Sequence, residues 1–429
     1  MPEKYNLDMG PDYKVEAMKV PNKIGDFKSL FELYFDQEEM RWVNWMMTEE
    51  KYIVNKEDSF LQLSIPTIDT IRMQSICKTL LQNGRHALLV GPTGTGKSLC
   101  MNQLLKRDFD NEEWNYYAIG FSAQTSANET ERIIDGKMEK KRKGVYGPAL
   151  GKEGVIFVDD LNMPQKQRYG AQPPIELLRQ WMDYQGWYDI DDPERNFRKL
   201  VNVRFGGAMG PPGNGRNSIS SRYIRHFNVL YIEPYSDDSL RYIFTTVMDW
   251  LFVAKNTPVP WPEPVKGLKD SIVATTILVY GETMKKFKPT PAKAHYSYNL
   301  RDVSKIFQGI AKSSAKAIAK EDDMIKLWAH ECLRVFQDRL ISLEDRDLFQ
   351  TLMKQTMKEK FKKEWSSVVK VEPLLFGSFV PLCFPGGDNT KKPYRDVYCE
   401  LYDREKLKKA AEDALEEYNG VNHSKKMDL

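Results

Sequence analysis

The sequence is poor in the residue types that build metal sites and disulfide frameworks. Among 429 residues there are only five cysteines and five histidines, and no CxxC pair occurs. The cysteines are Cys77, Cys100, Cys332, Cys383 and Cys399. An odd number of dispersed thiols predicts a reducing compartment and argues against a structural zinc site. The scattered histidines favour core or surface positions over metal ligation.

Long hydrophobic runs and an excess of one charge are also lacking. No apolar run approaches the roughly 18–20 residues that span a bilayer, and the N-terminal MPEKYNLDMG lacks the apolar stretch of a signal peptide. Lys and Arg total 63 against 60 Asp and Glu, a formal charge of +3. This balance does not call for nucleic acid or an anionic membrane surface, and we expect neither as a partner.

What remains is the composition of an ordinary soluble globular chain with more than one core. Hydrophobic residues make up 41% and charged residues 29%. We divide the chain into a lead-in at 1–60, an α/β subdomain at 61–257 and a helical subdomain at 258–429, which begins at a proline-rich break. The lead-in mixes proline, charge and aromatics, so it either packs on another part of the molecule or extends from it without fixed structure.

The middle segment alternates short apolar strands with helical stretches. Strands are expected at 87–90, 155–158, 203–208 and 229–232. This alternation is typical of a parallel α/β sheet. After residue 258 most of the chain indicates helix. The clearest case begins at Asn299, a candidate N-cap followed by one apolar helix face.

A glycine-rich loop follows the first of these strands and precedes a helical stretch. Its spacing, G-x-x-x-x-G-K-S, places backbone N–H groups around a phosphate at a helix N-terminus. The loop comprises Gly91, Pro92, Thr93, Gly94, Thr95, Gly96, Lys97 and Ser98. In this motif the lysine contacts the β- and γ-phosphates and the serine ligates Mg²⁺. The loop therefore predicts binding of ATP or ADP with Mg²⁺.

Two carboxylates end the second strand, as in the Walker B pattern. Asp159 would hold Mg²⁺ through water, and Asp160 would orient the attacking water. An acidic strand end facing solvent is the alternative, but the upstream phosphate loop disfavours it. Asp160 stands where a glutamate is more usual, and its side chain is shorter by one methylene.

Both motifs, with the helical region behind them, resemble the AAA+ ATPases. Four segments carry a closer resemblance: FVDDLNMP at 157–164, YGAQPPIELLRQ at 169–180, GAMGPPGNGRN at 207–217 and SRYIRHF at 221–227. Together they are similar to the third AAA+ module of a dynein heavy chain, most like the axonemal branch, over nearly the whole chain. The resemblance implies a AAA+ P-loop large subdomain, with a parallel sheet flanked by helices, followed by an all-α lid subdomain and a helical extension.

The family pattern then assigns further roles. The loop after the third strand carries an Asn sensor in the related pattern A-C-N-P-P, and Gly210 stands at that position here. A side-chain sensor is therefore missing, or displaced to Asn214 or Asn217, which weakens the case for rapid hydrolysis. A flexible surface loop over 206–215 is the alternative.

Three arginines and an apolar segment complete the expected site. Arg222 and Arg225 precede the fourth strand, where an arginine finger reaches a neighbouring module, and Arg301 resembles a second sensor on the lid. Each could instead be a structural or surface arginine, with Arg301 paired to Asp302 or solvent. Ile65 and Pro66 occupy the place of the adenine wall, with core packing as the alternative.

The resemblance also implies partners and location. These are neighbouring AAA modules of the same heavy chain and, through the whole motor, dynein intermediate and light chains and microtubules. The expected location is the cytoplasm and cytoskeleton, in the axoneme of a cilium or flagellum. No long heptad hairpin is present for direct microtubule binding. The basic run at 137–143 favours a solvated or linker-facing surface over nucleic-acid contact.

Two functions stay open. The first is an ATPase module that hydrolyses ATP slowly with a neighbour's arginine and shifts its subdomains. The second is a regulatory module that holds nucleotide with little turnover. A AAA+ protein outside the dyneins is a weaker third interpretation, which the segments at 169–180 and 207–217 disfavour.

Overall fold

The computed structural model describes residues 32–36, 39–47, 59–60, 63–213, 215–254, 259–378, 398–401, 403–421 and 427. Asn214 and Cys383 lie outside these residues. The chain forms two compact units. The first comprises Met1–Tyr52 with Pro66–Pro234, and the second comprises Ile53–Ile65 with Tyr235–Leu429.

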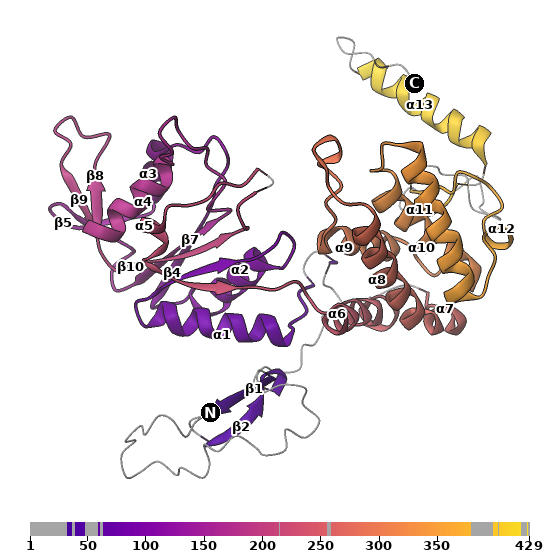
Figure 1. Cartoon of the computed structure of the whole chain (residues 1–429), viewed down its shortest axis with the longest axis horizontal. Helices are drawn as coiled ribbons and strands as arrows, with labels where there is room; N and C mark the ends of the chain where they lie inside the picture. Colours follow the sequence, from indigo (N-terminus) through magenta and orange to yellow (C-terminus); the bar gives the residue numbers. More distant parts are fainter. Residues whose placement is uncertain are drawn as a thin grey trace. The chain divides into compact units, whose positions relative to one another are not determined.

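The first unit alternates strands and helices in chain order (Figure 1). Its elements are β1 Leu33–Asp36, β2 Arg41–Asn44, a 3₁₀ turn Trp45–Met47, α1 Ile68–Gln82, β3 His86–Val90, α2 Lys97–Asp108, β4 Trp114–Gly120, α3 Ala127–Asp135, β5 Glu139–Arg142, β6 Val145–Gly147, β7 Glu153–Asp159, α4 Pro173–Tyr184, β8 Gly186–Tyr188, β9 Phe197–Leu200, β10 Val203–Met209, α5 Ser221–Ile224 and β11 Phe227–Tyr231.

The central sheet of this unit is five-stranded, in the order β11-β3-β10-β7-β4. Every neighbouring pair is parallel. The carboxyl ends of β3, β10 and β7 therefore lie side by side at one edge, which is where open parallel sheets place their ligands. The α/β fold class expected from the alternating strands is confirmed.

Helices cover both faces of the sheet, and alternate residues of each strand divide between two cores. Figure 1 shows α3, α4 and α5 grouped on one side of the sheet and α1 on the other. Leu104 of α2 and Phe157 of β7 belong to one core, whereas Ile156 and Trp181 of α4 belong to the other. Because both faces are covered, a strand such as β7 is buried along five consecutive residues.

A second, four-stranded sheet in the order β5-β6-β9-β8 carries the basic run. The run at 137–143 forms β5 and the turn that leads into β6, and the two strands pair antiparallel with a register shift between Lys140 and Arg142. Most of β5 is exposed. The charges thus lie on a solvated hairpin, as expected of the favoured interpretation of this run.

The described part of the lead-in is a β-hairpin. β1 and β2 pair antiparallel from Leu33 opposite Asn44 to Asp36 opposite Arg41. Its rings contact one another, with Phe35 and Trp42 edge to face at 5.3 Å between centroids.

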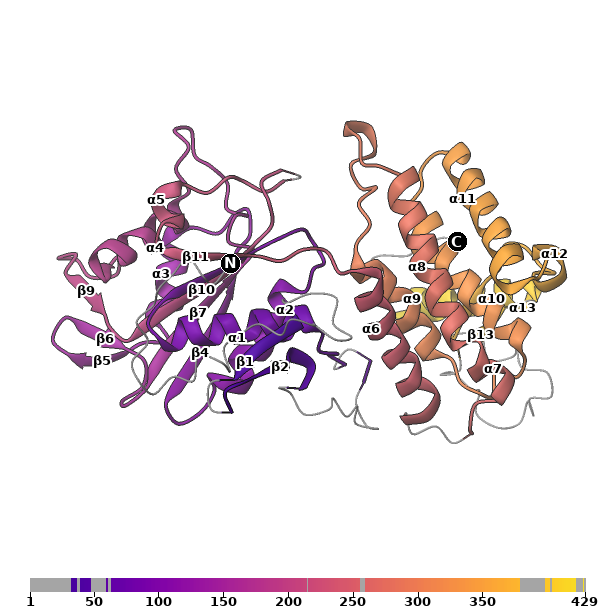
Figure 2. The same cartoon turned by 60° about the horizontal axis from the view of Figure 1, so that its bottom comes forward.

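The second unit is mostly helical (Figure 2). Its elements are α6 Asp237–Asp249, α7 Glu263–Gly267, α8 Lys269–Lys286, α9 Leu300–Lys312, α10 Glu321–Cys332, α11 Leu343–Thr356, α12 Trp365–Val368, β12 Phe376–Gly377, β13 Cys399–Glu400 and α13 Arg404–Val421. A 3₁₀ turn lies at Pro291–Lys293, and π-helical turns lie at Trp250–Ala254, Leu333–Gln337 and Met357–Phe361. No described helix is long and apolar enough to cross a membrane.

The division between the units falls at Pro234, ahead of the 257/258 boundary drawn from the prolines. Helix α6 explains the difference, because its apolar face belongs to the core of the helical unit. Phe244 of α6 stacks on Phe307 of α9, with 4.3 Å between ring centroids. Pro260 and Pro262 lie within this unit, just before α7, and do not mark its start.

The expected helix after Asn299 is α9. The Asn299 side chain caps it and Asp302 returns a bond to the Asn299 backbone, which forms a capping box. Its buried face includes Val303, Ile306 and Ile310, as the spacing predicts.

His86 at the start of β3 couples the sheet to pH. Its Nδ1 accepts a hydrogen bond from the backbone N–H of Phe205 on β10 at 3.0 Å, which requires the neutral ring. Burial first, and then the charges of His226 and Arg204, lower the pKa of His86 from 6.5 to about 4. The unfolded chain therefore takes up a proton at a higher pH than the folded one.

We predict that the first unit loses stability as pH falls from about 6.5 towards 4. The expected loss from this residue is about 2 kcal/mol at pH 5 relative to pH 8. Denaturant unfolding of the chain and of His86→Gln across this range measures it. The variant should be less stable at pH 8 and show a shallower decline. Parallel declines for both proteins would contradict the assignment.

Candidate functional site

The phosphate loop joins β3 to α2 at the carboxyl edge of the sheet. The Gly91 N–H donates to the Met209 carbonyl on β10 at 3.3 Å. A Cβ at Gly91 would lie 2.3 Å from the Ile232 carbonyl oxygen, and Gly94 and Gly96 have φ of 85° and 77°. Glycine is therefore required at these positions both for close approach and for left-handed backbone.

Lys97 lies buried within this loop, with 8% of the residue exposed. Its Nζ donates to the carbonyls of Gly91 at 2.9 Å and Pro92 at 2.6 Å, and to Thr95 Oγ1 at 3.3 Å. These uncharged hydrogen-bond acceptors thus hold the ammonium group of Lys97 at the centre of the loop. Phosphate oxygens carry more negative charge than these carbonyls and form stronger bonds with an ammonium group.

The start of α2 is also suited to an anion. Gly96 is the N-cap and supplies no side-chain hydrogen bond to the first turn. The N-terminal end of a helix dipole and its N–H groups attract phosphate. A glycine cradle, a held ammonium and an uncapped helix start together fit the triphosphate of a nucleotide.

Ser98 and Asp159 meet across the site. Ser98 Oγ donates to Asp159 Oδ1 at 2.8 Å, and the same oxygen accepts the Asp160 N–H at 2.9 Å. A hydroxyl and a carboxylate side by side are ligands that suit Mg²⁺. Among the described residues no group of three His, Cys, Asp or Glu side chains could hold a metal, and Mg²⁺ commonly completes its sphere with phosphate oxygens and water.

Asp160 follows the strand in an unusual conformation, with φ of 50°. Its side chain is 47% exposed and one oxygen lies 3.0 Å from Nη2 of Arg216. Sequence reasoning missed Arg216. The signal available was a single cation within the glycine-rich segment GPPGNGRN, directly after the expected sensor position.

The loop after β10 is tied down by hydrogen bonds. Gly213 and Arg216 exchange backbone N–H···O bonds, both at 3.0 Å. The Asn162 side chain donates to the Gly210 carbonyl at 2.7 Å. Asn217 donates its backbone N–H to the Asn162 carbonyl and its side-chain N–H to the Pro164 carbonyl at 2.9 Å. The displaced sensor considered at Asn217 is thus engaged in joining the loops after β7 and β10.

The two candidate finger arginines differ in their surroundings. Arg225 Nη2 lies 2.9 Å from Asp183 Oδ1 on α4, and His226 Nε2 lies 3.2 Å from the same oxygen. Arg222, on the short helix α5, is exposed.

The remaining candidates lie at the start of α1 and in the helical unit. Pro66 precedes the N-cap Thr67 in the first unit, whereas Ile65 packs against the core of the second. Arg301 is exposed and its backbone N–H donates to Asn299 Oδ1 at 2.9 Å. Asp302 pairs with Lys305 at 3.1 Å and Arg339 at 3.0 Å, so the alternative of an Arg301–Asp302 pair is not what forms.

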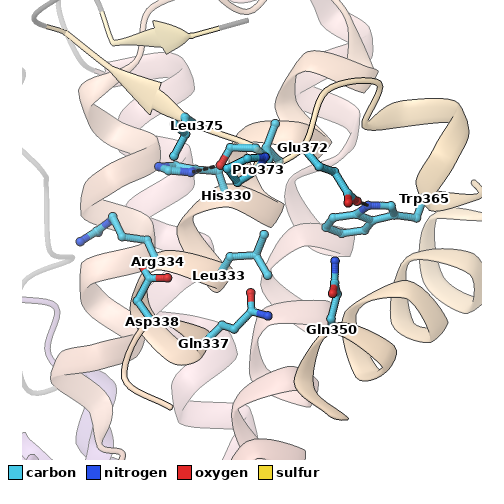
Figure 3. Close-up of a pocket in the computed structure, with 11 residues that line it drawn as sticks. His330, Leu333, Arg334, Gln337, Asp338, Gln350, Trp365, Glu372, Pro373 and Leu375 are labelled. Atoms are coloured by element: carbon cyan, nitrogen blue, oxygen red, sulfur yellow. Dashed lines mark hydrogen bonds between the residues drawn. The ribbon is translucent and has the colours of Figure 1, made fainter. Parts of the chain in front are cut away.

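A separate pocket of about 430 Å³ lies within the helical unit (Figure 3). Two of its lining side chains bond to the segment after α12: Trp365 Nε1 donates to Glu372 at 2.8 Å, and His330 Nδ1 is 3.0 Å from the Leu374 carbonyl. Burial lowers the pKa of His330 from its ordinary value. These contacts fasten the segment after α12 to α10, and we assign the chemistry to the phosphate loop instead.

Comparison with known proteins agrees with this geometry. Residues 52–235 match the family described as P-loop containing dynein motor region, and residues 272–370 match the AAA+ lid domain. Dynein axonemal heavy chain 1 of Mus musculus is 41% identical over 397 residues, covering 91% of this chain and 9% of that protein.

Other axonemal heavy chains match over similar lengths. Dynein axonemal heavy chain 3 of Homo sapiens is 38% identical over 439 residues, covering 97% of this chain and 10% of that protein. For dynein axonemal heavy chain 12 of Mus musculus the identity is 37% over 403 residues, covering 91% and 13%. The chain spans about a tenth of the length of the curated relatives it matches. The motor-region model and the lid model match successive parts of this chain, and the axonemal heavy chain is 41% identical over most of it. The chain therefore belongs to the dynein heavy chain family of AAA+ P-loop ATPases.

Proposed function

We propose that this chain is a AAA+ module of an axonemal dynein motor that binds ATP with Mg²⁺ at Lys97, Ser98 and Asp159. The observation that carries the proposal is the pairing of Ser98 with Asp159 beside a lysine already held in the phosphate loop. In this proposal the glycine loop and the start of α2 bind the phosphates. Mg²⁺ would neutralise charge on the transferring phosphoryl group.

Turnover at this site is proposed to be slow. Asp160, the group that would orient water, is one methylene shorter than the glutamate more usual at this position, and Gly210 stands where the family pattern has an Asn sensor. In AAA+ rings the arginine finger comes from an adjacent module, so hydrolysis at this site is proposed to need that module. ATP binding would then act chiefly on ring conformation, with Arg301 as the lid residue that senses nucleotide and Ile65 with Pro66 as the adenine wall.

The second candidate is a regulatory module that holds nucleotide with little turnover. The short Asp160 side chain and the glycine at position 210 favour it. In either case the proposal includes the position as third module and the axonemal location in the cytoskeleton. It also includes, as partners of the whole motor, the neighbouring modules, the intermediate and light chains and the microtubule. Their support is the similarity to axonemal heavy chains.

Lys97→Ala should lower affinity for both ATP and ADP by roughly 10–100-fold, because it removes charged hydrogen bonds to phosphate. Calorimetric titration with each nucleotide and Mg²⁺ measures the change. Lys78→Ala is the matched control, since it removes a lysine paired with Asp108 between α1 and α2. Nucleotide affinity equal to that of the unaltered chain in the Lys97 variant would sink the assignment.

Single-turnover hydrolysis separates the two candidate functions. In a heavy-chain motor that retains the following module, the first function predicts slow hydrolysis that Asp160→Asn abolishes, because the amide cannot act on water as the carboxylate does. Radiolabelled ATP and rapid quench give the rate. ATP retained unhydrolysed over many minutes by the unaltered module would support the regulatory function and count against the first.

Arg222→Ala should slow hydrolysis at the neighbouring module's site on the order of 10³-fold, as loss of an arginine finger does. Arg225→Ala is the matched comparison, and a smaller effect is expected because Asp183 already engages that side chain. The measurement is single-turnover hydrolysis in a motor in which every phosphate loop except that of the neighbouring module carries a Lys→Ala change. A larger loss in the Arg225 variant would reverse the assignment.

A further inference from the structure

One cation lies at the nucleotide edge of the sheet without a role in the functions described so far. Arg216 Nη2 is 3.0 Å from Asp160 Oδ1, and its side chain is only 18% exposed. Asp160 directly follows β7, Arg216 belongs to the loop after β10, and β10 lies between β7 and β3. The pair therefore stands next to the phosphate loop, whose Gly91 is bonded to the end of β10.

The space that Arg216 occupies exists because residue 210 is a glycine. A Cβ at Gly210 would lie 2.2 Å from Arg216 Nη1, 2.8 Å from its Cδ and 2.9 Å from its Cζ. Any side chain at this position would displace the guanidinium. The glycine that stands in place of the family's Asn sensor is thus also what makes room for the Arg216 side chain.

The backbone around Arg216 fixes where its side chain begins. The backbones of Gly213 and Arg216 exchange two hydrogen bonds, and Asn217, the next residue, is held by bonds to Asn162 and Pro164. Asn162 in turn is bonded to Gly210 and is fully buried. Because hydrogen bonds hold its backbone and its guanidinium packs against Gly210, Arg216 is more constrained than a residue in an ordinary mobile surface ion pair.

We propose that Arg216 is the residue that reads the γ-phosphate at this site, with Asp160 as its counter-ion when no nucleotide is bound. The inference rests on the proposed nucleotide binding. A guanidinium binds phosphate oxygens in a bidentate manner and keeps its charge at every physiological pH. Asp159, Asp160 and Lys97 are the other charged groups at this edge. In this proposal the γ-phosphate of ATP replaces the Asp160 carboxylate as the anion that Arg216 binds. The phosphates of ADP do not reach Arg216.

A purely structural role for Arg216 makes a different prediction. If its pair with Asp160 served only to close the loops, its loss would loosen the site and weaken every nucleotide alike. A γ-phosphate reader affects triphosphates selectively. The comparison of a triphosphate with a diphosphate on the same variant therefore separates the two roles.

The experiment is calorimetric titration of the 429-residue chain with Mg·ATPγS and with Mg·ADP. For Arg216→Ala we expect affinity for ATPγS to fall roughly 10–100-fold, the range for a lost charged hydrogen bond, with affinity for ADP within about twofold. Arg216→Lys should recover part of the loss, because it restores the charge but not the planar pair of donors.

Gly210→Ala tests the same arrangement with Arg216 intact. The added Cβ meets the far end of a flexible side chain, so the guanidinium moves and the variant should show the same selective loss of ATPγS affinity. Arg132→Ala is the matched control, since it breaks an exposed pair with Asp191 between α3 and the loop before β9. It should leave both affinities unchanged.

Equal losses for ATPγS and ADP in the Arg216→Ala variant, or no loss for either, would overturn the inference. In both cases ADP binding by the unaltered chain, and its weakening by Lys97→Ala, would leave the proposed nucleotide site standing. Absence of ADP and ATPγS binding by the unaltered chain would overturn the proposed function, and this inference with it.

Discussion

One carboxylate oxygen connects the parts of the candidate site. Asp159 Oδ1 accepts both the Ser98 hydroxyl and the Asp160 N–H, so it links the start of α2 to the end of β7. Because β10 lies between β3 and β7, this contact bridges across the strand whose following loop carries Arg216. The parallel sheet beneath them places the phosphate loop, the Ser98–Asp159 pair and the Asp160–Arg216 pair relative to one another.

The sequence predicted the features that depend on local pattern. The phosphate loop needs glycine at Gly91, Gly94 and Gly96 for steric reasons that any sequence with this fold must meet. The strands β3 and β7 are buried on both faces, so their central residues form continuous apolar runs, whereas Arg204 interrupts the apolar residues of β10. Family membership followed from longer segments and is confirmed by the comparisons.

Features that depend on contacts between distant residues were not predictable in the same way. Strand β4 reads WNYYAIG, a sequence whose polar and aromatic residues give no clear apolar run, and only its pairing with β7 makes it part of the sheet. Helix α6 precedes the proline-rich break in the chain yet packs with the helical unit. The proposed role of Arg216 depends on its contact with Asp160, in the loop after β7, and on the space that Gly210 leaves for its side chain. The sequence of the loop alone shows neither.

The site thus combines a glycine-rich loop that fits the phosphates of ATP with an ion pair, Asp160–Arg216, that we propose a γ-phosphate separates. A crystal structure of the chain with Mg²⁺ and ATPγS tests this account most directly. It predicts that the triphosphate lies in the loop from Gly91 to Ser98, that Lys97 Nζ contacts the β- and γ-phosphates, and that the Arg216 guanidinium contacts the γ-phosphate. A nucleotide bound elsewhere, or one bound in the loop while Arg216 remains on Asp160 away from the γ-phosphate, would contradict it.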